Sequence, residues 1–188
     1  FSSSSRALRL KAESRFTRAA PGGTGSAKTS GNYAPTLRPM AAAAEEGFDQ
    51  ILWLDAQEHA FAEEAGQMNI FFRIGDEVVT PELSGTILPG VTRESALTLL
   101  EDWGIKASTR RISMTELVEA SHQGSLMEIF GAGTAAVIAS VASISYLGHE
   151  ITAAPVSGDS LGQRLREALL GIQYGEIADS HNWVRLVS

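Results

Sequence analysis

The loop at residues 22–33, which reads GGTGSAKTSGNY, has the residue types that could react with a ligand. It places Lys28, one of only three lysines in the chain, among Gly, Ser, Thr and Asn. Small residues let a ligand approach the backbone closely, and a lysine that is desolvated there has a lowered pKa and a nucleophilic amine. The loop therefore predicts a lysine that reacts with a carbonyl compound. The alternative is a surface loop with a solvated lysine, because Gly-rich loops are common.

Two further stretches predict sites for an anion. In LPGVTR (88–93) a Pro-Gly turn precedes a predicted helix, so the N–H groups of Val91 and Thr92 are free and the Thr92 hydroxyl adds a donor. In FGAGTAAV (130–137) two glycines permit unusual backbone angles, and the Thr134 hydroxyl follows them. The alternatives are that Thr92 caps its own helix and that the glycines form a β-bulge or a strand crossing.

An acidic residue, Glu64 in EEAGQMN (63–69), lies between two strand-like runs. A carboxylate in a sheet needs a partner, which a protonated ring nitrogen would supply; alternatively, Glu64 is a solvated turn residue. An amine-reactive carbonyl at Lys28, a phosphate at 91–92 and 134, and a protonated ring at Glu64 together indicate pyridoxal phosphate as the cofactor. We expect no metal, because the four histidines show no ligand spacing. No Walker loop, dinucleotide-binding fingerprint or nucleophile motif is present either.

The composition is typical of a globular protein that buries a core, with 188 residues, 44% of them hydrophobic and 20% charged. A net charge of −7 without a basic stripe argues against nucleic acid as a partner. No apolar run reaches the roughly 18 residues of a membrane helix, and the lack of cysteine fits a reducing compartment. We therefore expect a cytoplasmic protein, with mitochondrion or plastid as the alternative if the Ser- and Arg-rich start is the end of a transit peptide.

The elements that must position these residues are strands and helices in irregular order, without an internal repeat. We predict disorder over residues 1–10 and strands over 12–19, 50–54, 59–63, 68–73, 106–113 and 127–148, the last broken at 131–133. We predict helices over 34–46, 92–105, 113–123 and 160–174. Thr92 is a predicted N-cap, and Ser113 with Glu116 forms a predicted capping box.

Five stretches, GGTGSAKTSGNY, EEAGQMNIFF, GTILPGVTR, FGAGTAAV and GIQYG, resemble in order and spacing the C-terminal part of the branched-chain amino acid aminotransferases. These are fold-type IV pyridoxal phosphate enzymes. The resemblance covers residues 17–188 and implies an α/β (mixed α and β) fold, the C-terminal large domain of the D-amino acid aminotransferase-like class, in which helices flank a β pseudo-barrel. It leaves residues 1–16 as a non-matching or disordered stretch, with the N-terminal domain missing.

The resemblance also implies a role for three polar side chains. Lys28 would be the Schiff-base lysine and would carry the proton between the substrate Cα and the cofactor. Tyr33 would hydrogen-bond the phenolic oxygen of the cofactor. Glu64 would pair with the ring nitrogen and keep it protonated, so that the ring can accept electrons.

The phosphate and the substrate carboxylate would be held mainly by backbone amides. The resemblance assigns the phosphate to the amides of Val91 and Thr92, to the Thr92 hydroxyl and to Thr134. It assigns the substrate carboxylate to N–H groups of the turn Thr134-Ala135-Ala136. A thiol switch found in some relatives is absent here, because alanines stand at its two positions.

The implied activity is transfer of an amino group between L-leucine, L-isoleucine or L-valine and 2-oxoglutarate, by a homodimer in the full-length family. Gln67 stands where many relatives have a smaller threonine, which leaves the substrate preference open. Relatives carry roughly another half-chain, so we interpret this sequence as a truncated or partial product. The alternatives are a non-catalytic fragment or pseudo-enzyme subunit, and an enzyme similar to D-amino acid aminotransferase or aminodeoxychorismate lyase.

Overall fold

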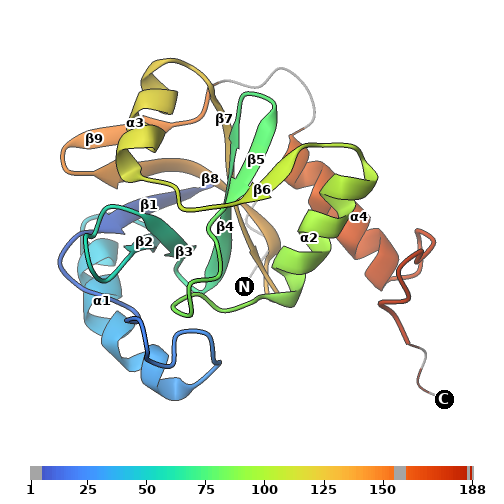
Figure 1. Ribbon diagram of the computed structural model, residues 1–188, viewed down its shortest axis with the longest axis horizontal. Coiled ribbons are helices and arrows are strands. Elements are labelled where there is room, and N and C mark those ends of the chain that lie inside the picture. Colours follow the sequence, from blue (N-terminus) through green and yellow to red (C-terminus); the bar gives the residue numbers. More distant parts are fainter. Residues whose placement is uncertain (1–5, 155–159, 186, 188) are drawn as a thin grey trace.

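Figure 1 shows the computed structural model of the protein, which describes residues 6–154, 160–185 and 187. Its elements, in chain order, are β1 (Leu8–Glu13), the 3-10 helices η1 (Ser30–Asn32) and η2 (Ala34–Thr36), α1 (Leu37–Glu45), β2 (Gln50–Leu54), β3 (Ala62–Ala65), β4 (Met68–Ile74), β5 (Glu77–Thr80), α2 (Val91–Asp102), β6 (Ala107–Thr109), α3 (Met114–His122), β7 (Leu126–Gly133), β8 (Val137–Tyr146), β9 (His149–Thr152) and α4 (Leu161–Gln173). None of the helices within these residues is both long and apolar enough to cross a membrane.

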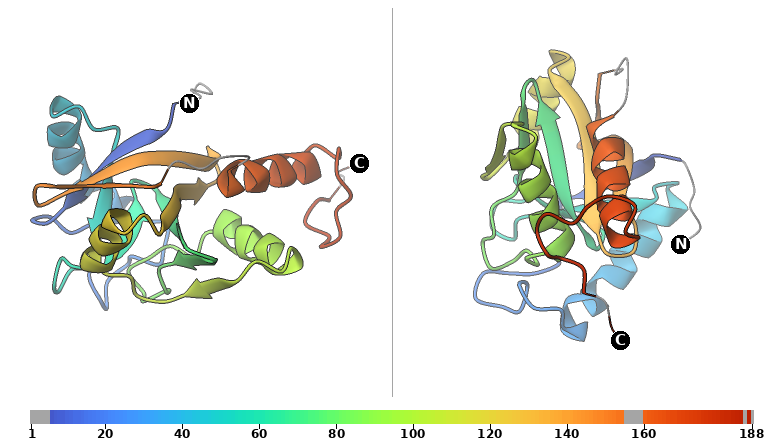
Figure 2. Two further views of the ribbon diagram at one scale, coloured as in Figure 1. Left: turned by 90° about the horizontal axis from the view of Figure 1, so that it is seen from above. Right: turned by 90° about the vertical axis from the view of Figure 1, so that its right-hand side faces the viewer.

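The strands form one sheet that curls into a barrel. Their order is β3-β2-β1-β8-β7-β4-β5-β6, with β9 paired to β8. An additional pairing joins β3 to β4, so β3, β2, β1, β8, β7 and β4 close on themselves. The strand β1 is parallel to both of its neighbours, β2 and β8. The helices α1, α2 and α4 lie against the outside of this sheet (Figure 2), which confirms the predicted mixed α and β fold with a flanked β pseudo-barrel.

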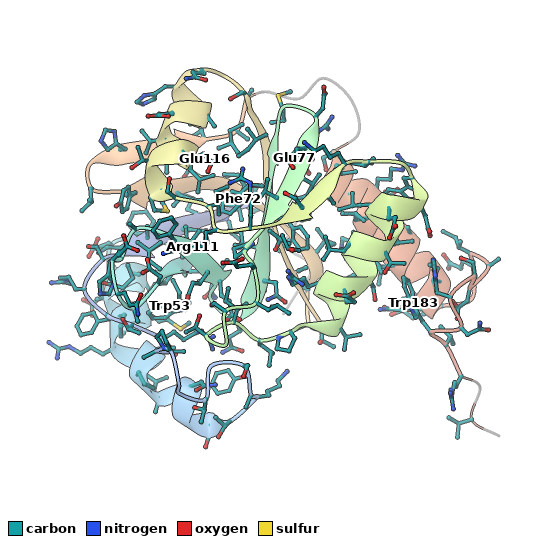
Figure 3. All side chains as sticks on the ribbon, viewed as in Figure 1. Trp53, Phe72, Glu77, Arg111, Glu116 and Trp183 are labelled. Atoms are coloured by element: carbon teal, nitrogen blue, oxygen red, sulfur yellow. The ribbon has the colours of Figure 1, made fainter. Side chains whose placement is uncertain are left out.

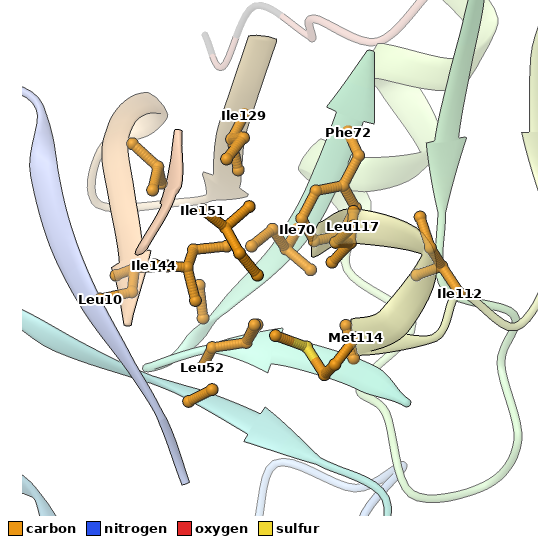
Figure 4. Packing of buried hydrophobic residues seen from close by; sticks show 14 of the residues in the cluster. Leu10, Leu52, Ile70, Phe72, Ile112, Met114, Leu117, Ile129, Ile144 and Ile151 are labelled. Atoms are coloured by element: carbon orange, nitrogen blue, oxygen red, sulfur yellow. The ribbon is translucent and has the colours of Figure 1, made fainter. Parts of the chain in front are cut away.

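The main hydrophobic core fills the inside of the barrel. The strands β1, β2 and β4 send alternate side chains inward, as expected for the period of two in a β-strand. In β3, β7 and β8 the inward residues are three apart, because the pairing of each shifts by one residue at a bulge. Helix α3 adds side chains of its own to this cluster (Figure 4). Fully or almost fully buried members include Leu10, Leu52, Ile70, Phe72, Ile112, Met114, Leu117, Ile129, Ile144 and Ile151.

A second cluster lies between the outer face of the sheet and the helices α2 and α4. The rings of Phe71 on β4 and Phe130 on β7 stack there at 5.1 Å between centroids. Apolar residues of both helices, such as Leu100 and Leu165, cover these rings. Helix α1 packs separately on β2 through Ala43. Because α2 packs on β4 and β7 through this cluster, its position relative to those strands is fixed.

The strand β1 corrects two expectations about the start of the chain. The sequence predicts that residues 1–16 are non-matching or disordered and that a strand covers 12–19; residues 1–5 lie outside the part of the chain that the structure describes. The structure instead has a strand over Leu8–Glu13, in the interior of the sheet between β2 and β8. The side chains of Leu10 and Ala12 are buried in the barrel. The strand exists because distant strands pair with both of its edges.

The helix starts were predicted with mixed success. The capping box before α3 is confirmed, because the Ser113 hydroxyl accepts the Glu116 N–H at 3.0 Å. The prediction that Thr92 caps its own helix is wrong. Helix α2 begins at Val91, and its N-cap is Gly90, which has no side chain to cap it.

Candidate active site

Glu64 is a buried residue of β3, and only 4% of it is exposed, so it is not a solvated turn residue. Its Oε1 accepts the Leu88 N–H at 2.7 Å. Its Oε2 lies 3.1 Å from Arg18 Nε, in an ion pair that is not aligned as a hydrogen bond. Burial raises the pKa of the Glu64 carboxyl to about 7, although the Arg18 charge and the Leu88 amide act to lower it.

Asn69 connects this acid to the start of α2. It lies opposite Glu64 in the β3–β4 pair, and its Nδ2 donates to the Leu88 carbonyl at 2.9 Å. A Cβ added at Gly90 would lie 2.2 Å from Asn69 Oδ1, so only glycine allows this approach. Because Leu88 binds both side chains, one segment holds the acid and the helix start together.

The first turn of α2 offers unpaired N–H groups. Its first intrahelical bond runs from the Glu94 N–H to the Gly90 carbonyl, at 3.1 Å. The N–H groups of Val91, Thr92 and Arg93 precede that bond, and no acceptor for them lies among the residues that the structure describes. Free N–H groups and the positive end of the helix dipole attract an anion. The arrangement can therefore bind a phosphate.

The lysine loop is held in shape by Asn32. Its Nδ2 donates to the carbonyls of Thr24 and Ala27, at 2.7 Å each. Lys28 follows directly and is exposed, so the expected desolvation of its amine by small neighbours is wrong for this single chain. Tyr33 is half-buried and begins the second 3-10 helix.

Arg18 and Gly25 attach the lysine loop to the segment that leads to α2. A Cβ on Gly25 would lie 2.5 Å from the Thr86 Cα, so the two backbones touch. Arg18 Nη2 donates to the Thr86 carbonyl and, at 3.4 Å, to the Gly25 carbonyl. The side chain of Arg18 is 7% exposed. Sequence reasoning missed this arginine because it belongs to no motif, and its partners lie far along the chain.

Two turns lie side by side at the same end of the barrel. A Cβ on Gly133 would lie 3.8 Å from the Gln67 carbonyl, which places the β3–β4 turn against the end of β7. The strand β7 runs through Gly133, so the break predicted at 131–133 is instead the turn at 134–136. The structure thus brings Gln67 close to Thr134, Ala135 and Ala136.

The predicted site residues therefore gather at one end of the barrel. Glu64 is hydrogen-bonded to Leu88 in the segment before α2, and Arg18 joins the loop that carries Lys28 and Tyr33 to the same segment. Five of the predicted residues are exposed, namely Lys28, Gln67, Val91, Thr134 and Ala135. This end of the barrel is accordingly open to solvent in the single chain.

A separate pocket of about 520 Å³ lies between α2, α4 and the segment after α4. That segment folds back on α2, because His181 Nε2 lies 2.7 Å from Asp102 Oδ2. Its Trp183 lines the pocket (Figure 3) and stacks on His181. The pocket shares Gly90, Val91 and Arg93 with the start of α2 but is not lined by Lys28 or Glu64. We therefore place the chemistry at the barrel end.

Comparison with known sequences identifies relatives over most of the chain. Residues 2–144 match the family described as amino-transferase class IV. The chain is 43% identical over 181 residues to branched-chain-amino-acid aminotransferase 2 of Bacillus subtilis, covering 96% of this chain and 50% of that protein. It is 46% identical over 173 residues to the branched-chain-amino-acid aminotransferase of Mycobacterium tuberculosis, covering 90% and 47%. The chain thus spans about half the length of the curated relatives it matches.

Solved structures that resemble this chain are also branched-chain amino acid aminotransferases. The branched-chain amino acid aminotransferase from Escherichia coli superposes with a TM-score of 0.78 at 27% identity, over 94% of this chain and 56% of that chain. The T.th. branched-chain amino acid aminotransferase with pyridoxamine 5'-phosphate superposes with a TM-score of 0.72 at 28% identity, over 91% and 53%.

Proposed function

The chain belongs to the class IV aminotransferases, and on that premise we propose that it is the cofactor-binding half of a branched-chain amino acid aminotransferase. The reaction would transfer an amino group between L-leucine, L-isoleucine or L-valine and 2-oxoglutarate. The cofactor would be pyridoxal 5'-phosphate, since a structural relative is described with pyridoxamine 5'-phosphate. The working enzyme would be a homodimer.

The donors and acceptors at the barrel end fit this cofactor. The unpaired N–H groups of Val91 and Thr92, with the Thr92 hydroxyl, would hold its phosphate. Glu64 is a buried carboxylate with a counterion on one oxygen only, which fits a protonated ring nitrogen as a second cationic partner. Tyr33 would hydrogen-bond the phenolic oxygen, and Thr134 would add a donor to the phosphate.

When bound, the cofactor supplies a carbonyl for amines and a ring that accepts electrons from the substrate Cα. Residues of the chain would bind the cofactor and the substrate and would move the proton. Lys28 would bind the carbonyl carbon through its amine and move a proton at the substrate Cα. Glu64 would keep the proton on the ring nitrogen. The backbone N–H groups of Ala135 and Ala136 would hold the substrate carboxylate, with Gln67 beside them.

The observation that carries the proposal is that Glu64 and Asn69 are both hydrogen-bonded to Leu88, while Asn69 packs closely against Gly90 at the start of α2. This arrangement ties a buried acid to a helix start with free N–H groups, and Arg18 ties the lysine loop to the same segment. A lysine, an acid and an anion site are the three groups that this cofactor needs from the protein.

The open barrel end favours a second candidate, a chain that binds cofactor but turns over poorly by itself. Exposure of Lys28 leaves the reacting groups in water, where electrostatic interactions are weaker. Such a chain would act as the subunit of a larger assembly. A transamination assay with L-leucine and 2-oxoglutarate, run on the chain alone, separates the two candidates.

The test of cofactor binding is borohydride reduction followed by peptide mapping. We expect pyridoxal phosphate to produce an absorbance band near the visible edge, and reduction to leave a stable label on Lys28. The band should be lost in Lys28→Ala and kept in Lys106→Ala, a control whose side chain is 72% exposed beside β6. A label on Lys11 or Lys106, or no label, would overturn the proposal.

A further inference from the structure

Arg18 is a buried charge for which the proposed chemistry has no role so far. Its guanidinium touches three groups from different parts of the chain: the Glu64 carboxylate, the Thr86 carbonyl and the Gly25 carbonyl. Taking an arginine out of water is costly unless it is paired and hydrogen-bonded. Nη2 donates to both carbonyls and Nε lies beside the carboxylate, a spread of contacts over one planar group that a lysine ammonium could not match.

The charges around Glu64 make Arg18 important to its protonation. The charged groups that act on it are the adjacent carboxylate Glu63, which raises its pKa, and Arg18, which lowers it. The Leu88 N–H from the segment before α2 is the remaining lowering influence, and burial opposes both. Arg18 is the cation that forms an ion pair with Glu64 among the residues described by the structure.

We propose that Arg18 is a positioning residue that favours the carboxylate form of Glu64 against the effect of burial and fixes the Lys28 loop to the segment before α2. One side chain would then set both the charge of the acid and the position of the lysine. This inference deepens the proposed function and rests on it for its purpose, although the charge and the tether exist without the cofactor.

The physical basis is that the two charges depend on each other. Protonation of Glu64 leaves the Arg18 guanidinium buried with only carbonyl partners, so the carboxylate form is favoured. A cationic ring nitrogen that approached Glu64 would act in the same direction as Arg18 and favour the carboxylate form further. Since the Arg18 charge stabilises that carboxylate, the proton stays on the ring nitrogen rather than moving to Glu64.

Two variants separate the charge from the tether. Arg18→Lys keeps the positive charge and loses the planar fork, whereas Arg18→Gln keeps a donor for the carbonyls and loses the charge. In the chain without cofactor, ¹³C NMR of labelled glutamate follows the Glu64 titration, with Glu64→Gln used for assignment. We expect a midpoint near 7 in the unmodified chain, a rise of about one pH unit in Arg18→Gln, and little change in Arg18→Lys.

The tether is read separately by hydrogen exchange. The Ala27 N–H bonds to the Thr24 carbonyl at 2.9 Å inside the lysine loop. We expect faster exchange of this amide in Arg18→Lys, because an ammonium cannot reach Glu64 and both carbonyls at once. Arg93→Gln is the matched control. Its guanidinium is also buried, with 4% of the side chain exposed, and donates to the Pro81 carbonyl away from Glu64.

A stability profile provides a second readout if one variant folds poorly. A carboxyl whose folded pKa is raised holds protons that the unfolded chain has released, so the free energy of unfolding falls as pH rises from about 4.5 to about 7. Arg18→Gln should extend that fall to higher pH, whereas Arg93→Gln should keep the original range.

Equal Glu64 midpoints in Arg18→Gln and the unmodified chain would overturn the role of the charge. An equal rise in Arg93→Gln and Arg18→Gln would do the same, because the effect would then follow from loss of any buried arginine. Unchanged Ala27 exchange in Arg18→Lys would overturn the tether. All three readouts use the cofactor-free chain, so they stand apart from a failure of Lys28 to bind pyridoxal phosphate.

Discussion

The N-termini of α2 and α4 differ in what their first N–H groups bind. At α4, the Leu161 and Gly162 N–H groups donate to the two oxygens of Glu128 at 2.8 Å each, and the Gln163 N–H donates to Ser160 Oγ at 3.0 Å. At α2, the corresponding groups are those of Val91, Thr92 and Arg93, and no described side chain accepts from them. Both helices pack on the same face of the sheet.

The difference shows what α2 lacks. A carboxylate from the sheet reaches α4 because Gly162 leaves room for it, since a Cβ there would lie 2.9 Å from Glu128 Oε1. Glycine also stands at the start of α2, at Gly90, but Asn69 fills the space with a neutral amide. The protein therefore closes the start of α4 with its own anion, whereas the first N–H groups of α2 have no acceptor among the described residues.

Removal of the anion from α4 should have the largest effect on folding. Glu128 is 7% exposed, so Glu128→Ala leaves two buried N–H groups without an acceptor. We expect a loss of about 3 kcal/mol of unfolding free energy, measured by urea titration. Ser160→Ala removes only the hydroxyl cap of the same helix and should cost about 1 kcal/mol. A Glu128→Ala cost no greater than that of Ser160→Ala would show that the carboxylate is not what closes α4.

Much of the fold is local enough to be predicted from sequence. The capping box at Ser113 lies within four consecutive residues, and the strands at 50–54 and 68–73 show up as apolar runs. The strand β1 was missed because its pairing is with β2 and β8, from distant parts of the chain. The alternation of apolar and charged residues in LRLKAE was the signal that could have identified it.

In the site, too, features set by neighbouring residues could be predicted and features set by distant residues could not. Short motifs pointed to Lys28, to Glu64 and to the free N–H groups at the start of α2. Their connections were not predicted, because Arg18 and Asn69 act through partners many residues away. The helix start was misplaced because a contact with Asn69, which no local rule contains, allows only glycine at position 90.

An added methyl group at the start of α2 should have an intermediate effect. Gly90→Ala places a Cβ against Asn69 Oδ1, and Asn69 must then leave the Leu88 carbonyl. We expect a cost of about 1–2 kcal/mol in urea titration. Gly31→Ala is the control, because a Cβ there meets nothing within 4 Å.

A double-mutant cycle identifies the cause of that cost. In an Asn69→Ala background the methyl group at position 90 has space, so the second change should cost close to nothing. A penalty that persists in this background would mean that Gly90 is required for another reason, and the steric explanation would be wrong.

Thr92→Val should have the smallest effect on folding and a clear effect on binding. Because Thr92 is in the first turn and Gly90 is the N-cap, loss of the hydroxyl should change the unfolding free energy by less than about 0.5 kcal/mol. A hydrogen bond to a phosphate is worth more, so pyridoxal phosphate should bind about tenfold more weakly. Thr92→Ser keeps the hydroxyl and should retain the affinity. A folding cost of about 1 kcal/mol in Thr92→Val, with unchanged affinity, would make Thr92 a cap after all and would leave α2 closed like α4.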